Sequence, residues 1–242
     1  MRGRGCHINI NIVRLRKAMI LAAGLGTRLY PLTRERPKAL IEYEGKPLLQ
    51  IITENLVKYG FKDIIVNIHH FPEMITDFLE NNSNFGVNIV ISDESNSLLE
   101  TGGALKKASW FFDSGPFLVH NVDVITDLDL NEFYQYHLSE KNLATLAVTT
   151  RKTTRPLLIN NSRKLCGWKN NITGEEIIVR QQPDLLEVGF SGIYILNPEI
   201  FNLMHETGKF SVLPVFLRLA KDHPVGTYQY LGQWKDMGKI NG

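Results

Sequence analysis

Cysteine is scarce in this sequence, and long hydrophobic runs are missing from it. The two cysteines, Cys6 and Cys166, are too few for a disulfide framework or a cysteine-rich zinc site. A reducing compartment such as the cytoplasm is therefore the expected location. The longest apolar stretch of the first half, Ala18 to Ala23, is far shorter than the ~20 residues that a membrane-spanning helix needs. We therefore expect no association with a membrane.

An excess of charge of either sign is also missing. The chain has 27 Lys and Arg residues against 25 Asp and Glu residues, whereas a protein that binds nucleic acid mainly through phosphate contacts carries a strong basic excess. A nucleic-acid partner is therefore not expected, although a few local cations suffice for one small phosphate chain. With 43% hydrophobic and 21% charged residues, the composition is that of a globular chain. Its 242 residues predict one domain, or at most two.

Residues 1–17 differ from the rest of the chain. They are rich in arginine, and Ile8, Ile10 and Ile12 alternate with asparagines. The basic start is reminiscent of a secretory signal, but no apolar segment of ~7–15 residues follows it. We interpret residues 1–17 as an N-terminal tail, so that residues 18–242 would form a single domain.

Short apolar strands alternate with helical patterns in residues 18–142. The apolar run Ala18–Ala23 ends at Gly24, which is typical of a buried strand that enters a loop. Pro47–Tyr59 has apolar residues at helical spacing, and Gly60 suits its C-terminal stop. The other elements expected in this half are strands at 64–68, 87–91 and 117–122, a helix at 72–79, and a helix at 101–111 capped by Thr101.

This alternation predicts a Rossmann-like α/β fold with a mostly parallel sheet flanked by helices. Ligands bind such sheets beyond the carboxyl ends of the strands, where Gly24–Arg28, Asp93–Gly103 and Asp123 are expected. Residues 143–242 are interpreted as a β-rich, substrate-facing lobe on the same sheet, without a β-helix repeat. Its expected strands are 144–149, 157–159, 177–179, 190–196 and 225–230, and its expected helices are 198–204 and 212–220.

The segment from Gly24 to Lys38, GLGTRLYPLTRERPK, is the most informative part of the sequence. Two glycines after a strand allow backbone N–H groups to approach a phosphate chain closely, and Arg28 and Lys38 add positive charge. The segment is not a P-loop, because it lacks Gly-Lys-Ser/Thr. It is not a dinucleotide-binding fingerprint either, because Leu29 stands at the third glycine position. A lone Gly-x-Gly would indicate only a turn, but a turn does not require the rest of this string.

The whole segment resembles the signature of the sugar-1-phosphate nucleotidyltransferases, G-x-G-T-R-x-x-P-L-T-x-x-x-P-K, at every specified position. The resemblance extends over most of residues 18–240 and includes Gly45–Leu48, Leu99–Gly103 and Trp234–Gly238. It is greatest to short members without a β-helix domain, the N-acetylmuramate-1-phosphate uridylyltransferases and related mannose-1-phosphate guanylyltransferases. It implies transfer of a nucleotidyl group from a nucleoside triphosphate to a sugar 1-phosphate, which yields a nucleotide sugar and pyrophosphate.

The resemblance also implies roles for individual residues. Arg28 and Lys38 would be catalytic, because they would stabilise the charge of the transferring phosphoryl group and of pyrophosphate. The sugar would contact Asn121 and Gly192, and residues 143–242 would form the sugar-binding lobe. Gly102 and Gly103 would lie against the nucleobase, where a side chain would not fit. The remaining residues implied to line the nucleotide are Ala23, Gly24, Gly26 and Thr27.

Two aspartates are the candidate ligands of a magnesium ion. Asp123 follows an apolar strand at the ligand edge of the predicted sheet, and Mg²⁺ typically takes one or two carboxylates together with phosphate oxygens. Asp236 lies in the segment Trp234–Gly238, and in the family an aspartate at each of these two positions holds the metal. Either aspartate alone is also typical of a strand end or a turn. Val122 stands where the family usually has glycine, which is tolerated if its side chain points into the core.

Other polar and aromatic residues near these motifs are interpreted as structural. His120 and the aromatic run 110–112 are expected in the core. Arg151, Lys152 and Arg155 either hold the sugar phosphate or form a solvated basic loop. Sugar selectivity is expected to come from residues 151–192.

Two further functions compete with nucleotidyl transfer. A catalytically idle homologue that binds a nucleotide sugar and regulates a partner is supported only by Val122. A dinucleotide-binding oxidoreductase is opposed by the missing third glycine. Within the leading function, the resemblance in overall pattern and length to the N-acetylmuramate-1-phosphate uridylyltransferases implies UTP with N-acetylmuramate 1-phosphate or a similar amino sugar, with GTP and mannose 1-phosphate as the alternative. Base contacts near Gly24 and Gly102 would be largely backbone, so side chains do not identify the base, and the oligomeric state stays open.

Overall fold

The described chain, residues 16–113 and 115–238 of a computed structural model, folds into short strands and amphipathic helices. The α-helices are α1 Leu48–Lys58, α2 Pro72–Asn81, α3 Glu100–Lys107, α4 Leu130–Glu140, α5 Ile200–Leu203 and α6 Val212–Leu219. The strands are β1 Arg16–Leu21, β2 Glu42–Tyr43, β3 Lys46–Pro47, β4 Phe61–Ile68, β5 Asn88–Asp93, β6 Phe117–Asn121, β7 Val124–Thr126, β8 Ala144–Thr149, β9 Leu157–Ile159, β10 Leu165–Lys169, β11 Glu176–Ile178, β12 Leu186–Leu196, β13 Val225–Gln229 and β14 Trp234–Asp236. None of the described helices is long and apolar enough to span a bilayer.

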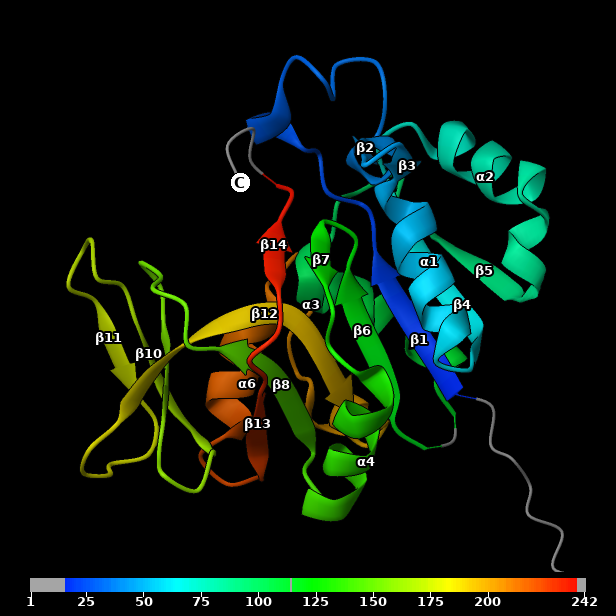
Figure 1. The fold of residues 1–242 in the computed structure, drawn as a ribbon. Coiled ribbons are helices and arrows are strands. Elements are labelled where there is room, and N and C mark those ends of the chain that lie inside the picture. Colours follow the sequence, from blue (N-terminus) through cyan, green and yellow to red (C-terminus); the bar gives the residue numbers. More distant parts are fainter. Residues whose placement is uncertain (1–15, 114, 239–242) are drawn as a thin grey trace, which may run out of the picture.

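Ten of the described strands form one mixed sheet (Figure 1). Its order is β11-β10-β9-β12-β6-β1-β4-β5, and β8 joins β13 to β12. Strands β6, β1, β4 and β5 are parallel, whereas β12 is antiparallel to β6 and begins the second half of the sheet. The predicted Rossmann-like α/β fold is therefore confirmed. The carboxyl ends of β1 and β6 are neighbours because Leu21 is in register with Asn121.

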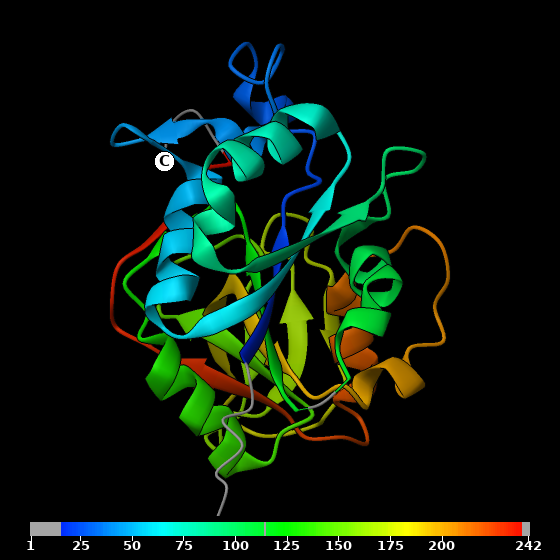
Figure 2. The ribbon, with the colours of Figure 1, turned by 90° about the vertical axis from the view of Figure 1, so that its right-hand side faces the viewer.

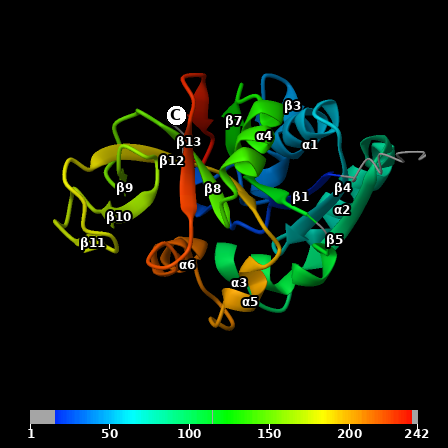
Figure 3. The same ribbon diagram turned by 90° about the horizontal axis from the view of Figure 1, so that it is seen from below.

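Helices cover both faces of the sheet (Figures 2 and 3). Successive strand residues point to opposite faces, so Met19 and Val119 join the core beneath α3, α5 and α6. Ile20 and Leu118 join the core beneath α1, α2 and α4. Because the two layers hold the central strands on both sides, their carboxyl ends form a rigid edge on which a site can be built.

The structure differs from the predicted elements in several places. Residues 1–15 of the expected tail lie outside the described residues, but Arg16 and Lys17 belong to β1, where Lys17 pairs with Asp113 at 2.6 Å. The prediction missed α4, although Asp129 caps it by accepting hydrogen bonds from the backbone N–H groups of residues 131 and 132. The prediction also missed β10, and it missed the short strands β7 and β14, which are too brief to show a period.

Two predictions for the segment that contains α3 are wrong. Thr101 does not cap α3 but lies inside it, and its hydroxyl accepts a hydrogen bond from the Val212 backbone N–H at 3.0 Å, which ties α3 to α6. Trp110 is not in the core, since it is 65% exposed, whereas Phe111 and Phe112 are buried. The reason is a 3-10 turn over Ser109–Phe111, which turns Trp110 outward.

Because His120 and His137 are buried, we expect the protein to lose stability in mild acid. Burial lowers the pKa of His120 and of His137 to about 4, from an ordinary value of 6.5. Between these values the unfolded chain binds more protons than the folded chain, so the free energy of unfolding falls as the pH drops through this window. The fall amounts to at most about 1.4 kcal/mol per pH unit for each histidine.

Urea unfolding of His137→Gln from pH 7 to pH 4 measures this dependence. The free energy of unfolding of this variant should fall less steeply with pH than that of the wild-type protein. His205→Gln, on the exposed surface, should keep the wild-type slope. Equal slopes for all three proteins would show that His137 does not cause the loss.

Candidate active site

The two predicted metal ligands meet because the last described strand returns to β6. Asp123 follows β6, and Asp236 is the final residue of β14. Strand β14 pairs antiparallel with β7, with Asp236 opposite Val124. Beyond β14, the Met237 backbone N–H donates to the Asp123 carbonyl oxygen at 2.8 Å. This pairing places the segment that carries Asp236 alongside Asp123 at the ligand edge of the sheet.

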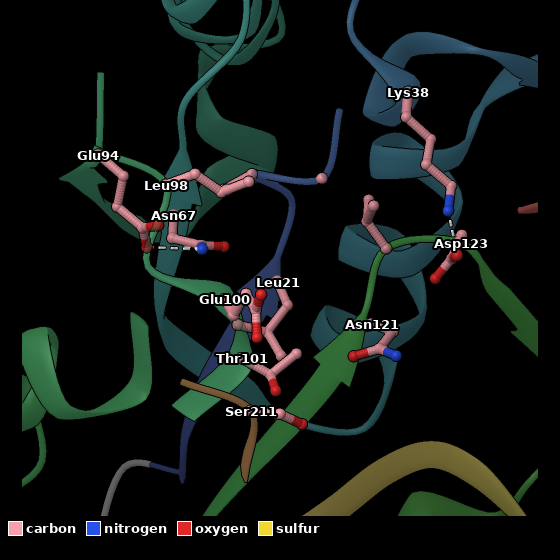
Figure 4. Close-up of a pocket in the computed structure, with 13 residues that line it drawn as sticks. Leu21, Lys38, Asn67, Glu94, Leu98, Glu100, Thr101, Asn121, Asp123 and Ser211 are labelled. Atoms are coloured by element: carbon pink, nitrogen blue, oxygen red, sulfur yellow. Dashed lines mark hydrogen bonds and ion pairs between the residues drawn. The ribbon is translucent and has the colours of Figure 1, made fainter. Parts of the chain in front are cut away.

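Lys38 and both aspartates surround Gly238. A Cβ atom at Gly238 would lie 2.8 Å from Asp236 Oδ1, 2.9 Å from Asp123 Oδ2 and 2.9 Å from Lys38 Nζ. The two carboxylate oxygens are therefore no farther apart than the sum of the first two distances. Lys38 Nζ forms an ion pair with Asp123 Oδ2, drawn in Figure 4, and the two side chains are only 10% and 17% exposed. Any side chain at position 238 would compete with these charges for space.

Two pockets open on either side of this cluster and share Asn121 and Asp123. The first pocket has a volume of about 370 Å³ and includes Ala23, Gly24 and Lys38 in its wall (Figure 4). The second pocket has a volume of about 500 Å³. Its wall contains the predicted residues Arg28, Gly192 and Asp236. Because both pockets include Asn121 and Asp123 in their walls, a ligand in either pocket would lie near Asp123.

The loop after β1 that contains Gly24 and Gly26, which we call the glycine loop, positions Arg28 through its backbone. Gly26 has a left-handed conformation (φ 65°) and precedes the 3-10 turn Thr27–Leu29 that carries Arg28. Its carbonyl oxygen accepts a hydrogen bond from Thr33 Oγ1 at 2.8 Å. A Cβ atom at Gly26 would lie 2.8 Å from the Thr33 methyl carbon. Gly26 and Thr27 therefore shape the loop, and neither is among the residues that line the two pockets.

Gly102 and Gly103 differ from their expected arrangement. Both backbone N–H groups donate to the Phe210 carbonyl oxygen, at 2.9 and 3.1 Å. A Cβ atom at Gly102 would lie 2.5 Å from the Phe210 ring, and one at Gly103 would collide with the Gly208 carbonyl oxygen. These glycines were expected to leave room for a base, but the 208–210 segment fills the space where their side chains would be. Their contact with a nucleobase stays a prediction.

Gly102→Ala should destabilise the protein. In an exposed helix the change from glycine to alanine stabilises by about 1 kcal/mol, but here the methyl group meets the Phe210 ring. Overpacking of this kind costs roughly 1–3 kcal/mol, so the free energy of unfolding in urea should fall. Gly24→Ala is the control, since its methyl group would meet nothing within 4 Å. An unchanged or higher stability of Gly102→Ala would contradict the packing described here.

The sequence-based prediction missed a polar pair in the first pocket. Asn67, near the end of β4, donates from Nδ2 to Glu94 Oε1 at 2.8 Å (Figure 4). Its Oδ1 accepts a hydrogen bond from the Ala22 backbone N–H at 2.7 Å. The other carboxylate oxygen of Glu94 accepts from the Leu99 backbone N–H at 3.1 Å. Together these bonds connect the glycine loop to the segment before α3. An asparagine within the apolar run of β4 was the available signal.

The donor atoms at the shared boundary suit a hard cation. Among the described residues no group of three or more His, Cys, Asp or Glu side chains could hold a metal by itself. Two carboxylates are nevertheless the protein share that Mg²⁺ usually takes, since phosphate oxygens and water complete its shell. The chemistry of Asp123 and Asp236 therefore fits Mg²⁺ that arrives with a phosphate substrate.

Comparisons with known proteins agree with this geometry. The family model described as Nucleotidyl transferase matches residues 17–157. An N-acetylmuramate alpha-1-phosphate uridylyltransferase of Neisseria meningitidis serogroup B is 33% identical over 232 residues, which cover 93% of this chain and 94% of that protein. Mannose-1-phosphate guanyltransferase 2 of Candida glabrata is 31% identical over 92% of this chain, which spans only 61% of that protein's length.

One solved structure shows how far the fold extends. The UDP-glucose pyrophosphorylase from Acinetobacter baumannii matches with a TM-score of 0.75, over 93% of this chain and 89% of the other. The identity is 18%, so this similarity concerns the fold alone.

Proposed function

Because this chain belongs to the sugar-1-phosphate nucleotidyltransferase family, we propose that it transfers a uridylyl group from UTP to N-acetylmuramate 1-phosphate or a similar amino sugar 1-phosphate, with Mg²⁺ as cofactor. The observation that most directly supports this reaction is that Lys38, Asp123 and Asp236 cluster at the boundary of two pockets. The choice of UTP and an amino sugar rests on the N. meningitidis relative, which this chain matches over nearly its whole length.

The proposed reaction is an in-line displacement at the α-phosphorus of the nucleotide. An oxygen of the sugar phosphate forms the new P–O bond, and pyrophosphate leaves with the electron pair of the broken P–O bond. The attacking phosphate is already ionised near neutral pH, so no general base is required. The protein needs to position two anions and to offset their charge.

The residues of the site divide these tasks. The base and ribose would occupy the first pocket, and the sugar the second, beside Asn121 and Gly192. Arg28 and Lys38 would offset the charge on the triphosphate. Asp123 and Asp236 would hold Mg²⁺, which when bound neutralises phosphate charge and orients the phosphate oxygens.

The two alternatives have weaker support. GTP with mannose 1-phosphate follows from the C. glabrata relative, of which this chain spans 61%. An idle regulatory homologue rested on Val122, but Val122 is only 3% exposed and packs in the core beneath α1. Its backbone N–H also donates to the Leu21 carbonyl oxygen at 3.1 Å, which links the ends of β1 and β6. The larger side chain is therefore accommodated without displacing Asp123 from the cluster.

Pyrophosphate release with Mg²⁺ tests the proposal. UTP, GTP, CTP and dTTP are each combined with the 1-phosphates of N-acetylmuramate, N-acetylglucosamine, glucose and mannose. Release with UTP and an amino sugar phosphate is the expected result, and release only with GTP and mannose 1-phosphate would select the alternative. No release with any pair, despite tight binding of a nucleotide sugar, would favour the idle homologue.

A further inference from the structure

Arg151 lies in the wall of the second pocket, where neighbouring groups fix the orientation of its side chain. It follows β8, and its guanidinium lies over the Trp234 ring, with Cζ 3.8 Å from the ring centroid. Its Nη2 donates to the Phe190 carbonyl oxygen at 2.8 Å. Stacking and this hydrogen bond fix the plane of the guanidinium, so a ligand would find it already oriented.

The strand beneath Arg151 is shaped to admit it. A Cβ atom at Gly189 would lie 2.8 Å from Arg151 Cγ and 2.9 Å from its Nε, so any other residue at position 189 would push the side chain away. Trp234 is held in turn, because its Nε1–H donates to the Ser191 carbonyl oxygen at 3.0 Å. Gly189 and Trp234 therefore form the two walls of a slot for the arginine.

The partial burial of Arg151 in this slot makes folding less favourable in free energy. Arg151 Nε is buried without a hydrogen-bond partner, and among the described residues no carboxylate forms an ion pair with the guanidinium. Burial lowers the pKa of Arg151, and the charge of Asp236 only partly opposes this. A half-buried cation without an ion pair is unfavourable unless an anion completes the site.

The position of Arg151 indicates which anion that is. Trp234 and Asp236 are two residues apart on β14, so their side chains lie on the same face of the strand. The guanidinium over Trp234 thus stands beside the carboxylate proposed to hold Mg²⁺. Arg28 and Lys235 also line the second pocket, but of the three cations there Arg151 is the one that a stacked ring and a backbone carbonyl hold in place.

We propose that Arg151 binds the phosphate of the sugar 1-phosphate, the group that attacks the nucleotide. This inference rests on the proposed function and deepens it. Gly189 is a positioning residue for Arg151, and Trp234 supports the guanidinium from the other side. The alternative interpretation of residues 151–155 as a solvated basic loop then holds only for the exposed Lys152 and Arg155.

Steady-state kinetics of Arg151→Met test the inference. A hydrogen bond between charged groups is worth roughly 1.5–3 kcal/mol, so KM for the sugar 1-phosphate should rise ~10–100-fold. KM for the nucleoside triphosphate should change less than about twofold, because its cations are untouched. Arg151→Lys should give an intermediate KM, since an ammonium retains the charge but not the fork or the stacking. Lys152→Met is the matched control and should keep both KM values.

Gly189→Ala tests the same point without removing a charge. The added methyl group should displace the guanidinium and raise KM for the sugar 1-phosphate, with the thermal midpoint recorded to show that the variant folds. Unchanged KM for the sugar 1-phosphate in folded Arg151→Met and Gly189→Ala would overturn the inference. So would a loss of affinity for the nucleoside triphosphate as large as that for the sugar phosphate.

A comparison of two sugar 1-phosphates shows whether Arg151 binds the phosphate or another anionic group of the ligand. N-acetylmuramate 1-phosphate carries an additional carboxylate, and N-acetylglucosamine 1-phosphate does not. Their affinities for enzyme loaded with a non-hydrolysable UTP analogue are measured by titration calorimetry. An equal loss for both in Arg151→Met supports the phosphate, and a loss confined to N-acetylmuramate 1-phosphate would assign Arg151 to its carboxylate instead. A wild-type enzyme inactive with every pair would contradict the proposed function, whereas active wild type with unaffected variants contradicts only the role of Arg151.

Discussion

Asp123→Asn is expected to lower kcat by about 10³-fold. Charge stabilisation by a bound metal is worth several kcal/mol, and about 4 kcal/mol corresponds to this factor. Asparagine keeps the shape of the side chain but removes the charge, so the loss reports on metal binding more than on packing. The Mg²⁺ concentration for half-maximal pyrophosphate release should rise in the same variant.

Asp77→Asn is the matched control, because Asp77 is an exposed carboxylate on α2. Its kcat and Mg²⁺ requirement should equal those of the wild-type protein. If Asp123→Asn retained near-normal turnover at limiting Mg²⁺, Asp123 could not be a metal ligand. Circular dichroism and thermal unfolding of both variants show whether a loss of activity reflects a loss of fold.

Lys38→Ala is expected to lower the rate by about 10²–10³-fold, the effect of losing one preorganised charged donor. Arg28→Ala should cost a similar factor. Lys38 forms an ion pair with Asp123, and a bound triphosphate and Mg²⁺ would compete for both of these groups. Removing Lys38 therefore should not raise the Mg²⁺ requirement, in contrast to Asp123→Asn.

Lys62→Ala provides the control for a lost lysine, since Lys62 is exposed near the start of β4. Turnover of this variant should be unchanged. Near-normal turnover of Lys38→Ala would remove Lys38 from the catalytic residues. A rise in its Mg²⁺ requirement as large as that of Asp123→Asn would instead mean that Lys38 helps to hold the metal.

The glycine loop and Asp123 carry local signals in the sequence, whereas Asp236 is assigned only through the resemblance to the family. A strand followed by Gly24 identifies a loop at the ligand edge, and a polar residue after an apolar run identifies Asp123. Their convergence with Lys38 could not be predicted. It depends on the pairing of β14 with β7, two strands of three residues each, which are too short for a hydrophobic period.

The glycines at 102 and 189 show a second limit of sequence patterns. A glycine indicates that space is needed beside the backbone, but it does not indicate what fills that space. Gly102 is predicted to face a base, and the space beside its Cα is filled by Phe210. No role was predicted for Gly189, although its lack of a side chain leaves room for Arg151. Both neighbours are distant in sequence, so only the tertiary structure identifies them.

The pairing of β14 with β7 also bears on the order in which the protein is made. Synthesis is vectorial, and N-terminal regions fold first. The main sheet is complete with β13, whereas Trp234 and Asp236 leave the ribosome after every strand of that sheet. Until they emerge, Lys38 can pair with Asp123 and the slot for Arg151 has one wall. We therefore expect a translation product interrupted before β14 to contain every strand of the main sheet but to lack the two residues proposed to complete the site.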